Sequence, residues 1–101
     1  MKNYNELVKR ITNMGFIPIY SDERRYSAIF KEIKIFVEVF SDIAITIITN
    51  TNYYTYWINK KEDISFVIKQ IRLIKKYKKL EPQKFRPAPT ARPNDLEITE
   101  E

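Results

Sequence analysis

The sequence predicts an α+β domain in which an N-terminal helix and a long C-terminal helix flank a four- to five-stranded antiparallel sheet, with a disordered tail behind them. Three observations support this prediction. Apolar residues recur at helical spacing near residues 4–14 and 60–80, whereas residues 16–58 form extended apolar segments. Short polar connections separate these segments, which is typical of hairpins. Four of the five prolines fall within residues 81–101, so we expect one domain over residues 1–80 and a separate tail.

The first helix is predicted over about residues 4–14. Asn3 can cap its N-terminus, with Glu6 three residues later at the spacing of a capping box. Gly15 supplies the stop, because glycine readily adopts the left-handed conformation that ends many helices. The apolar residues at helical spacing are Tyr4, Leu7, Val8, Ile11 and Met14.

The strands are predicted at residues 16–20, 25–30, 33–40, 43–49 and 53–58. Every second residue of the third segment is β-branched, which is the period of a sheet with one well-buried face: Ile33, Ile35, Val37 and Val39. The short connections predict antiparallel hairpins, arranged as an open sheet or a strongly bent half-barrel. This element order resembles that of helix-backed single-strand-binding domains such as the whirly-like group, although no diagnostic motif accompanies it.

The second helix is predicted from about Lys60 to Leu80. Asn59 precedes it, and Glu62 follows three residues later, which repeats the capping-box pattern. Pro82 ends any continuation. Residues 81–101 contain few large apolar side chains and finish in an acidic sequence, so we expect an extended, mobile tail that builds no core.

The absence of cysteine and histidine limits the chemistry available to this chain. No disulfide framework or thiolate zinc site can form, and the commonest general base and transition-metal ligand are missing. Glu32, Lys34 and the upstream Asp22 are similar to the E-x-K pattern of metal-dependent nucleases, but that triplet arises often by chance in a chain rich in Lys and Glu. We therefore predict a protein without catalytic activity, cofactor or metal.

Location and origin are constrained only loosely. No stretch approaches 18 uninterrupted apolar residues, and no leader-like apolar run follows the N-terminal lysine, so we expect a cytoplasmic protein without a membrane partner. The heavy use of Lys and Ile is consistent with the AT-rich genome of a mobile element such as a virus or plasmid.

The second helix carries two apolar stripes. Ile64, Val67, Ile68, Ile71 and Ile74 lie on one side at 100° per residue, and this stripe suffices to pack a surface helix. Two interpretations of the opposite stripe remain open, packing within one chain and a homodimer interface. That stripe consists of Phe66, Leu73, Tyr77 and Leu80.

A basic sector lies between these stripes. It is formed by Lys69, Arg72, Lys76 and Lys79, with Lys75 at its margin. Residues 1–80 carry a net charge of +7, from fifteen Lys and Arg less eight Asp and Glu. The sector is either an ordinary solvated helix face or a site for a polyanion.

Aromatic residues on the predicted strands form the last candidate site. If both helices cover one face of the sheet, some of these rings are exposed and can stack on unpaired bases, each stack contributing about 1–3 kcal/mol. The alternative is that they pack within the core. The rings considered are Phe36, Phe40, Tyr53, Tyr54, Tyr56 and Trp57.

Two functional hypotheses follow. The first is a small, non-enzymatic, dimeric protein that binds single-stranded nucleic acid through the basic sector and through Phe36, Phe40, Tyr54, Tyr56 and Trp57. The second is a protein–protein accessory or inhibitor factor of a mobile element, which acts on a host protein. The acidic end of residues 81–101 allows three interpretations under either hypothesis: it only aids solubility, it docks a partner protein, or it folds back onto the basic helix and competes with nucleic acid.

Overall fold

The computed structural model describes residues 2–50 and 52–77, so the predicted tail at residues 81–101 lies outside the described residues. The predicted α+β class is confirmed, with two helices and a five-stranded sheet. The helices are α1 (Lys2–Asn13) and α2 (Lys61–Tyr77), and the strands are β1 (Ile17–Ser21), β2 (Arg25–Phe30), β3 (Ile33–Val39), β4 (Ile43–Ile48) and β5 (Tyr53–Ile58).

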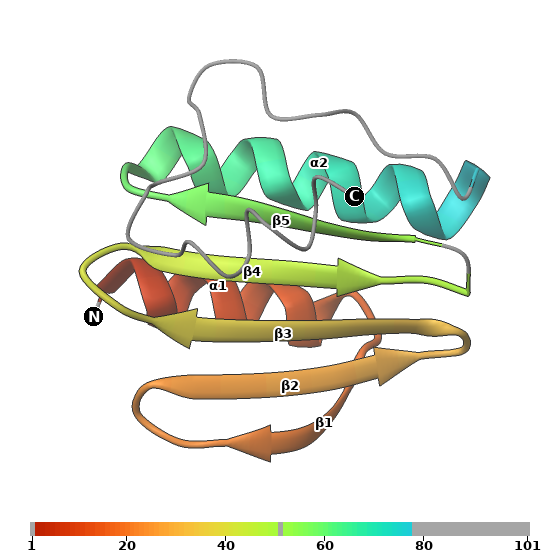
Figure 1. The fold of residues 1–101 in the computed structure, drawn as a ribbon, viewed down its shortest axis with the longest axis horizontal. Coiled ribbons are helices and arrows are strands. Elements are labelled where there is room, and N and C mark those ends of the chain that lie inside the picture. The colour runs from red at the N-terminus through yellow and green to blue at the C-terminus, as the bar shows by residue number, and fades with distance from the viewer. Residues whose placement is uncertain (1, 51, 78–101) are drawn as a thin grey trace.

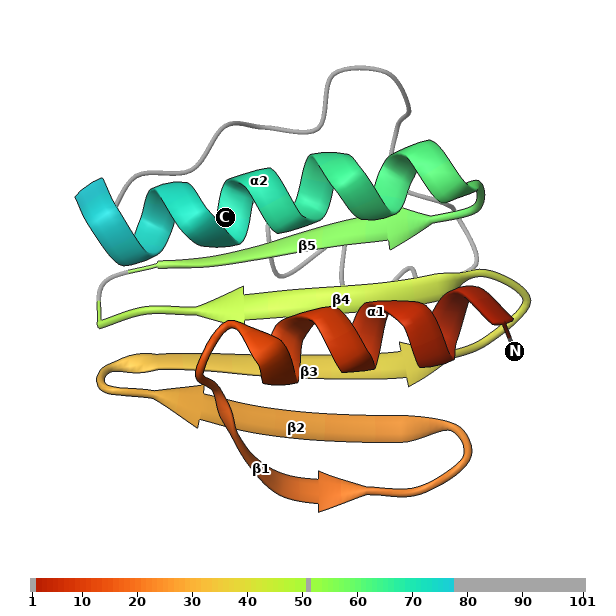
Figure 2. The same cartoon turned by 180° about the vertical axis from the view of Figure 1, so that it is seen from behind.

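The sheet is an open antiparallel meander in which neighbours in the sequence are neighbours in space, in the order β1-β2-β3-β4-β5. Both helices pack against one face of it: α1 lies lengthwise over β3 and β4, and α2 runs along β5 (Figures 1 and 2). We call the helix-covered side the inner face and the other side the outer face. Among the described residues, no helix lies on the outer face.

The core lies between the inner face and the helices. Ile35 of β3 pairs with Ile47 of β4, and Val37 of β3 pairs with Ile45, so the β-branched positions predicted to face inward meet in register. All four are at most 1% exposed. The alternation predicted from the third segment is therefore confirmed.

Both helices bury one side against this sheet. In α1, Leu7 and Ile11 are fully buried, and the helix ends at the predicted place because Gly15 adopts φ +100°. A Cβ at Gly15 would meet only the Phe30 ring at 3.8 Å, so the backbone conformation rather than space favours glycine here. In α2, the first predicted stripe is buried in full, namely Ile64, Val67, Ile68, Ile71 and Ile74.

The start of α2 differs from the predicted capping box. The carboxylate of Asp63, not of Glu62, reaches back and accepts the backbone N–H groups of Asn59 (2.8 Å) and Lys60 (3.1 Å). The Asn59 side chain donates instead to Asp42, at 2.9 Å. Asp63 rather than Glu62 caps the helix because Asp63 lies on its buried side, 2% exposed, where a carboxylate needs hydrogen-bond donors.

A bulge in β1 changes which of its side chains share a face. Ile17 pairs with Ile29 and Pro18 with Ala28, but Tyr20 rather than Ile19 pairs with Ser27. The extra residue inverts the alternation beyond it. Tyr20 therefore lies on the outer face, where strict alternation from the buried Phe16 would have placed it inward.

Candidate nucleic-acid interface

The outer face carries three exposed aromatic rings. Phe36 of β3 is 46% exposed, Tyr53 of β5 is 37% exposed and Tyr20 of β1 is 51% exposed. Phe36 was predicted as a binding residue, and Tyr53 was considered as one of the crowded rings. Tyr20 was not identified from the sequence as a candidate binding residue, because no local pattern predicts the bulge that turns its side chain outward.

The other predicted stacking rings are less accessible. Tyr56 lies on the inner face, 1% exposed, and its ring meets Phe66 edge-on at 5.6 Å. Tyr54 shares the inner face with it and is half-buried. Trp57 lies on the outer face but is only 2% exposed, with the half-buried Phe40 ring 6.3 Å away. Direct stacking on Tyr56 or Trp57 is therefore incompatible with this structure, and for these two rings the alternative, packing within the protein, holds.

The basic sector lies on a different layer from the exposed rings. Lys69, Arg72 and Lys76 are exposed on α2, which packs on the inner face, whereas Phe36 faces outward. The outer face has two cations of its own, Arg25 of β2 and Lys34 of β3. The structure thus separates the predicted site into two parts. Lys79 lies outside the described residues.

Lys75 has a structural role that the sequence did not indicate. Its Nζ donates to the main-chain carbonyl of Met14, at 2.6 Å, just beyond the C-terminal end of α1. The same ammonium lies 4.2 Å from the centre of the Phe30 ring and 5.8 Å from that of Phe16. Both the carbonyl and the ring faces attract a cation, so Lys75 joins the end of α2 to the end of α1.

The second stripe of α2 is not one uniform surface. Phe66 packs against the core through Tyr56, so it is an intrachain contact. Leu73 is half-buried on the same side of the helix. The Tyr77 side chain and Leu80 lie outside the described part of the chain, and the homodimer interface predicted for this stripe remains a prediction.

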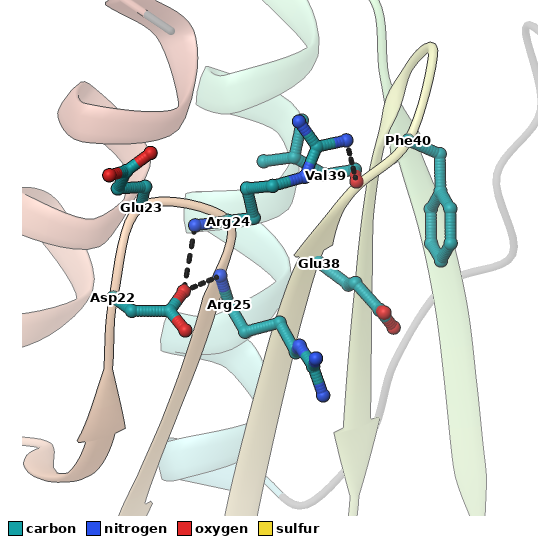
Figure 3. Close-up of a pocket in the computed structure, with 7 residues that line it drawn as sticks. All are labelled: Asp22, Glu23, Arg24, Arg25, Glu38, Val39 and Phe40. Carbon is teal, nitrogen blue, oxygen red and sulfur yellow. Dashed lines mark hydrogen bonds between the residues drawn. The ribbon is translucent and has the colours of Figure 1, made fainter.

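The turn between β1 and β2 is organised around Asp22 (Figure 3). One carboxylate oxygen accepts the backbone N–H groups of Arg24 and Arg25, both at 2.8 Å. The other accepts the Tyr20 hydroxyl at 2.6 Å. The backbone carbonyl of Asp22 accepts the Tyr4 hydroxyl at 2.9 Å, which connects the turn to α1.

These bonds shift the pKa values of both partners. The hydrogen bond from Tyr20, followed by the two backbone donors, lowers the pKa of Asp22 below 3.8. The same hydrogen bond raises the pKa of Tyr20 above 10.0, because ionising the phenol would place two negative charges together. At neutral pH the carboxylate is therefore ionised and the phenol is protonated, which are the states that a hydrogen bond from Tyr20 to Asp22 requires.

Two hollows adjoin this turn. The one in Figure 3 measures about 460 Å³ and contains the guanidinium of Arg24, which donates to the carbonyl of Val39 at 3.2 Å. The other measures about 400 Å³ and lies on the outer face between Tyr20 and Phe36, above Ser27. Arg25 and Glu38, an outer-face pair on neighbouring strands, line both hollows.

No metal site supports the nuclease interpretation within residues 2–50 and 52–77. Asp22 precedes β2 and Glu32 follows it, so the six residues of that strand, roughly 20 Å, separate the two carboxylates. The Glu32 carboxylate accepts the Asn50 amide at 2.8 Å. No group of three or more carboxylates capable of holding a metal ion occurs among the described residues. Within the same residues, neither helix is long and apolar enough to cross a bilayer.

Comparisons of the chain with protein-family models, curated proteins and solved structures returned no match. We therefore infer its function from the arrangement of its own residues.

Proposed function

We propose that this protein binds single-stranded nucleic acid on the outer face of its sheet, without catalysis and in the cytoplasm. The observation that carries the proposal is the set of three exposed rings, Tyr20, Phe36 and Tyr53, on the face that no described helix covers. Exposed rings on a flat sheet stack on bases of any sequence, because every base presents a π-face.

Exposed cations lie on both layers of the protein, beside the rings on the sheet and on the helices. Arg25 and Lys34 supply positive charge beside the rings and outnumber the single acidic side chain there, Glu38, so the phosphates of a bound strand can pair with them. Of the eleven exposed Lys and Arg residues in the described part of the chain, six lie on the helices. Tyr53 begins β5 at the end of the molecule where α2 finishes, so a strand that leaves the rings at that corner meets the basic part of α2 (Figure 1).

Two charge-matched double variants test which layer holds the phosphates. One replaces Arg25 and Lys34 by Gln, and the other replaces Arg72 and Lys69 by Gln, so each removes one Arg and one Lys. Affinity for a fluorescent oligo-dT would be measured by anisotropy across a salt series. Each lost phosphate contact should flatten the plot of log affinity against log salt by about 0.7.

We expect the outer-face pair to flatten the slope by about 1.4 and the helix pair to flatten it less. A slope changed only by the helix pair would move the site to α2. Wild-type protein that fails to bind the oligonucleotide at low salt would contradict the proposed function.

A second candidate function is the binding of another protein. It is favoured by the edge strand β1, in which Ile17 and Ile19 are 66% and 63% exposed and no residue is charged. Large apolar side chains that are exposed together on one strand mark surfaces that contact other proteins. The partner would be a host protein, as for an accessory factor of a mobile element. Replacing Ile17 and Ile19 by Thr should abolish such binding and leave the affinity for oligo-dT unchanged.

A further inference from the structure

We infer that the hollow between Tyr20 and Phe36 is a slot that takes one unpaired nucleobase, an inference that rests on the proposed function. The two rings lie on either side of Ser27 in one row across the sheet, because Tyr20 pairs with Ser27 and Ser27 pairs with Phe36. The row thus places a small side chain between two large flat ones. The hollow above it, about 400 Å³, is in the size range of small-molecule sites.

The spacing of the strands suits one flat ring. Neighbouring strands lie about 4.8 Å apart, so the backbones of Tyr20 and Phe36, two strands apart, are separated by about 9.6 Å. A base held between two rings needs about 3.4 Å on each side, or about 7 Å in all. The rings need to lean toward each other only slightly to close on a base. A larger side chain at the floor would project into the space between the two rings.

The slot is held open before a ligand arrives. The Tyr20 hydroxyl donates to Asp22 at 2.6 Å, and Asp22 is itself fixed by the backbone N–H groups of Arg24 and Arg25. A ring that is 51% exposed would otherwise sample several rotamers, and fixing one on binding costs affinity. The bulge at Ile19 completes this arrangement, because it turns Tyr20 onto the outer face. Tyr20 contacts the base, and Asp22 is a positioning residue.

The chemistry of the slot favours a base over a proline ring, the other flat group that aromatic grooves bind. Ser27 places a hydroxyl, both donor and acceptor, at the floor between the rings, where the polar edge of a base can bond to it. Proline has no such edge. Arg25 lines the same hollow and supplies a cation for the phosphate beside the base.

The test blocks the slot without altering any ring or charge. Ser27→Leu fills the floor, and Ser65→Leu makes the same change at an exposed position of α2. Binding of both variants and of wild type to fluorescent oligo-dT would be measured by anisotropy, and their folding by thermal melting. We expect Ser27→Leu to lose about 5- to 150-fold in affinity, the contribution of one stacked base, with an unchanged salt slope, and Ser65→Leu to match wild type.

A second variant tests the role of Asp22 in holding the slot open. Tyr20→Phe retains the ring but removes its bond to Asp22, so the affinity should fall by only about two- to tenfold, because one rotamer must then be fixed on binding. Asp22→Asn in the Tyr20→Phe background should then cause no further loss of affinity. An additional loss would show that Asp22 acts elsewhere.

Photo-cross-linking of the wild-type protein tests the slot without any variant, so it applies even if Ser27→Leu does not fold. Oligonucleotides carrying 5-iodouracil cross-link on irradiation to aromatic side chains stacked on the base. We expect the cross-link at Tyr20 or Phe36. If wild type binds oligo-dT but cross-links only elsewhere, or if folded Ser27→Leu binds as wild type does, the slot is wrong while the proposed function stands. If wild type binds a proline-rich peptide at Tyr20 and Phe36 and no oligonucleotide, both are wrong.

Discussion

The two faces of the sheet are built from the same strands, yet neighbouring residues on them have opposite roles. Ile35 is fully buried beneath the helices, whereas Phe36, the next residue, is 46% exposed on the outer face. Both are apolar, so burial of apolar area alone does not explain where each lies. The inner face uses β-branched side chains that interlock, whereas the outer face spaces large rings between small residues. The first arrangement stabilises the fold, and the second leaves ring faces and a hollow open to solvent.

Trp57 is an exception to this contrast, because it lies on the outer face and is nevertheless buried, at 2% exposed. Trp57→Ala should therefore destabilise the protein by about 3–5 kcal/mol, as truncation of buried aromatics does. Phe36→Ala is the control on the same face, and it should leave stability nearly unchanged while weakening oligo-dT binding. Urea denaturation of both variants measures their free energies of unfolding and tests this difference. A stable Trp57→Ala protein that has lost only binding would return Trp57 to the stacking site.

The faces can be compared within one strand. Ile45→Ala removes a fully buried side chain from the inner face of β4 and should cost about 2–5 kcal/mol. Ile48→Ala makes the same change at a half-buried outer-face position and should cost about 1 kcal/mol. Chemical denaturation gives both values. Equal losses would mean that the outer face is covered in solution, by a second copy of the chain or by another segment.

Two adjacent lysines on α2 allow a comparison between an ammonium group bonded to another segment and one at an exposed position. Lys75→Gln removes an ammonium that binds the Met14 carbonyl and the Phe30 ring, so stability should fall by about 1.5–3 kcal/mol. Lys76→Gln, at an exposed position, should have a smaller effect. The thermal midpoints of the two variants test this difference. An unchanged thermal midpoint in Lys75→Gln would show that Lys75 does not join the two helices in solution.

The smallest effect concerns the Asp22 turn and its dependence on pH. The pKa of Asp22 is lowered in the folded protein, so its carboxylate stabilises the fold above pH 3.8, and this contribution disappears as the pH falls through the folded pKa. Tyr20→Phe removes the largest cause of the shift and should move the pKa of Asp22 back toward 3.8. Carbon-detected NMR titration of the carboxyl group measures it. Identical pKa values in both proteins would mean that the Tyr20 hydroxyl does not bind Asp22.

Much of the fold follows from local patterns. The alternation in β3, the helical spacing in α1 and α2, and the stop at Gly15 each depend on a few adjacent residues, and all are present in the structure. The start of α2 agrees with the prediction to within one residue, but the carboxylate that caps it is that of Asp63 and not of Glu62, because Asp63 is the buried one of the two.

The candidate site was predicted less completely than the fold. The sequence alone determined that the sheet would have one apolar face and that aromatic residues would be abundant on its strands, since alternation and composition are properties of the chain itself. Only the tertiary structure decided which rings are exposed, and it separated them from the α2 lysines. The physical reason is that the β1 bulge, the inward turn of Lys75 and the burial of Trp57 arise from contacts between segments far apart in the sequence. Such contacts leave no local pattern to detect.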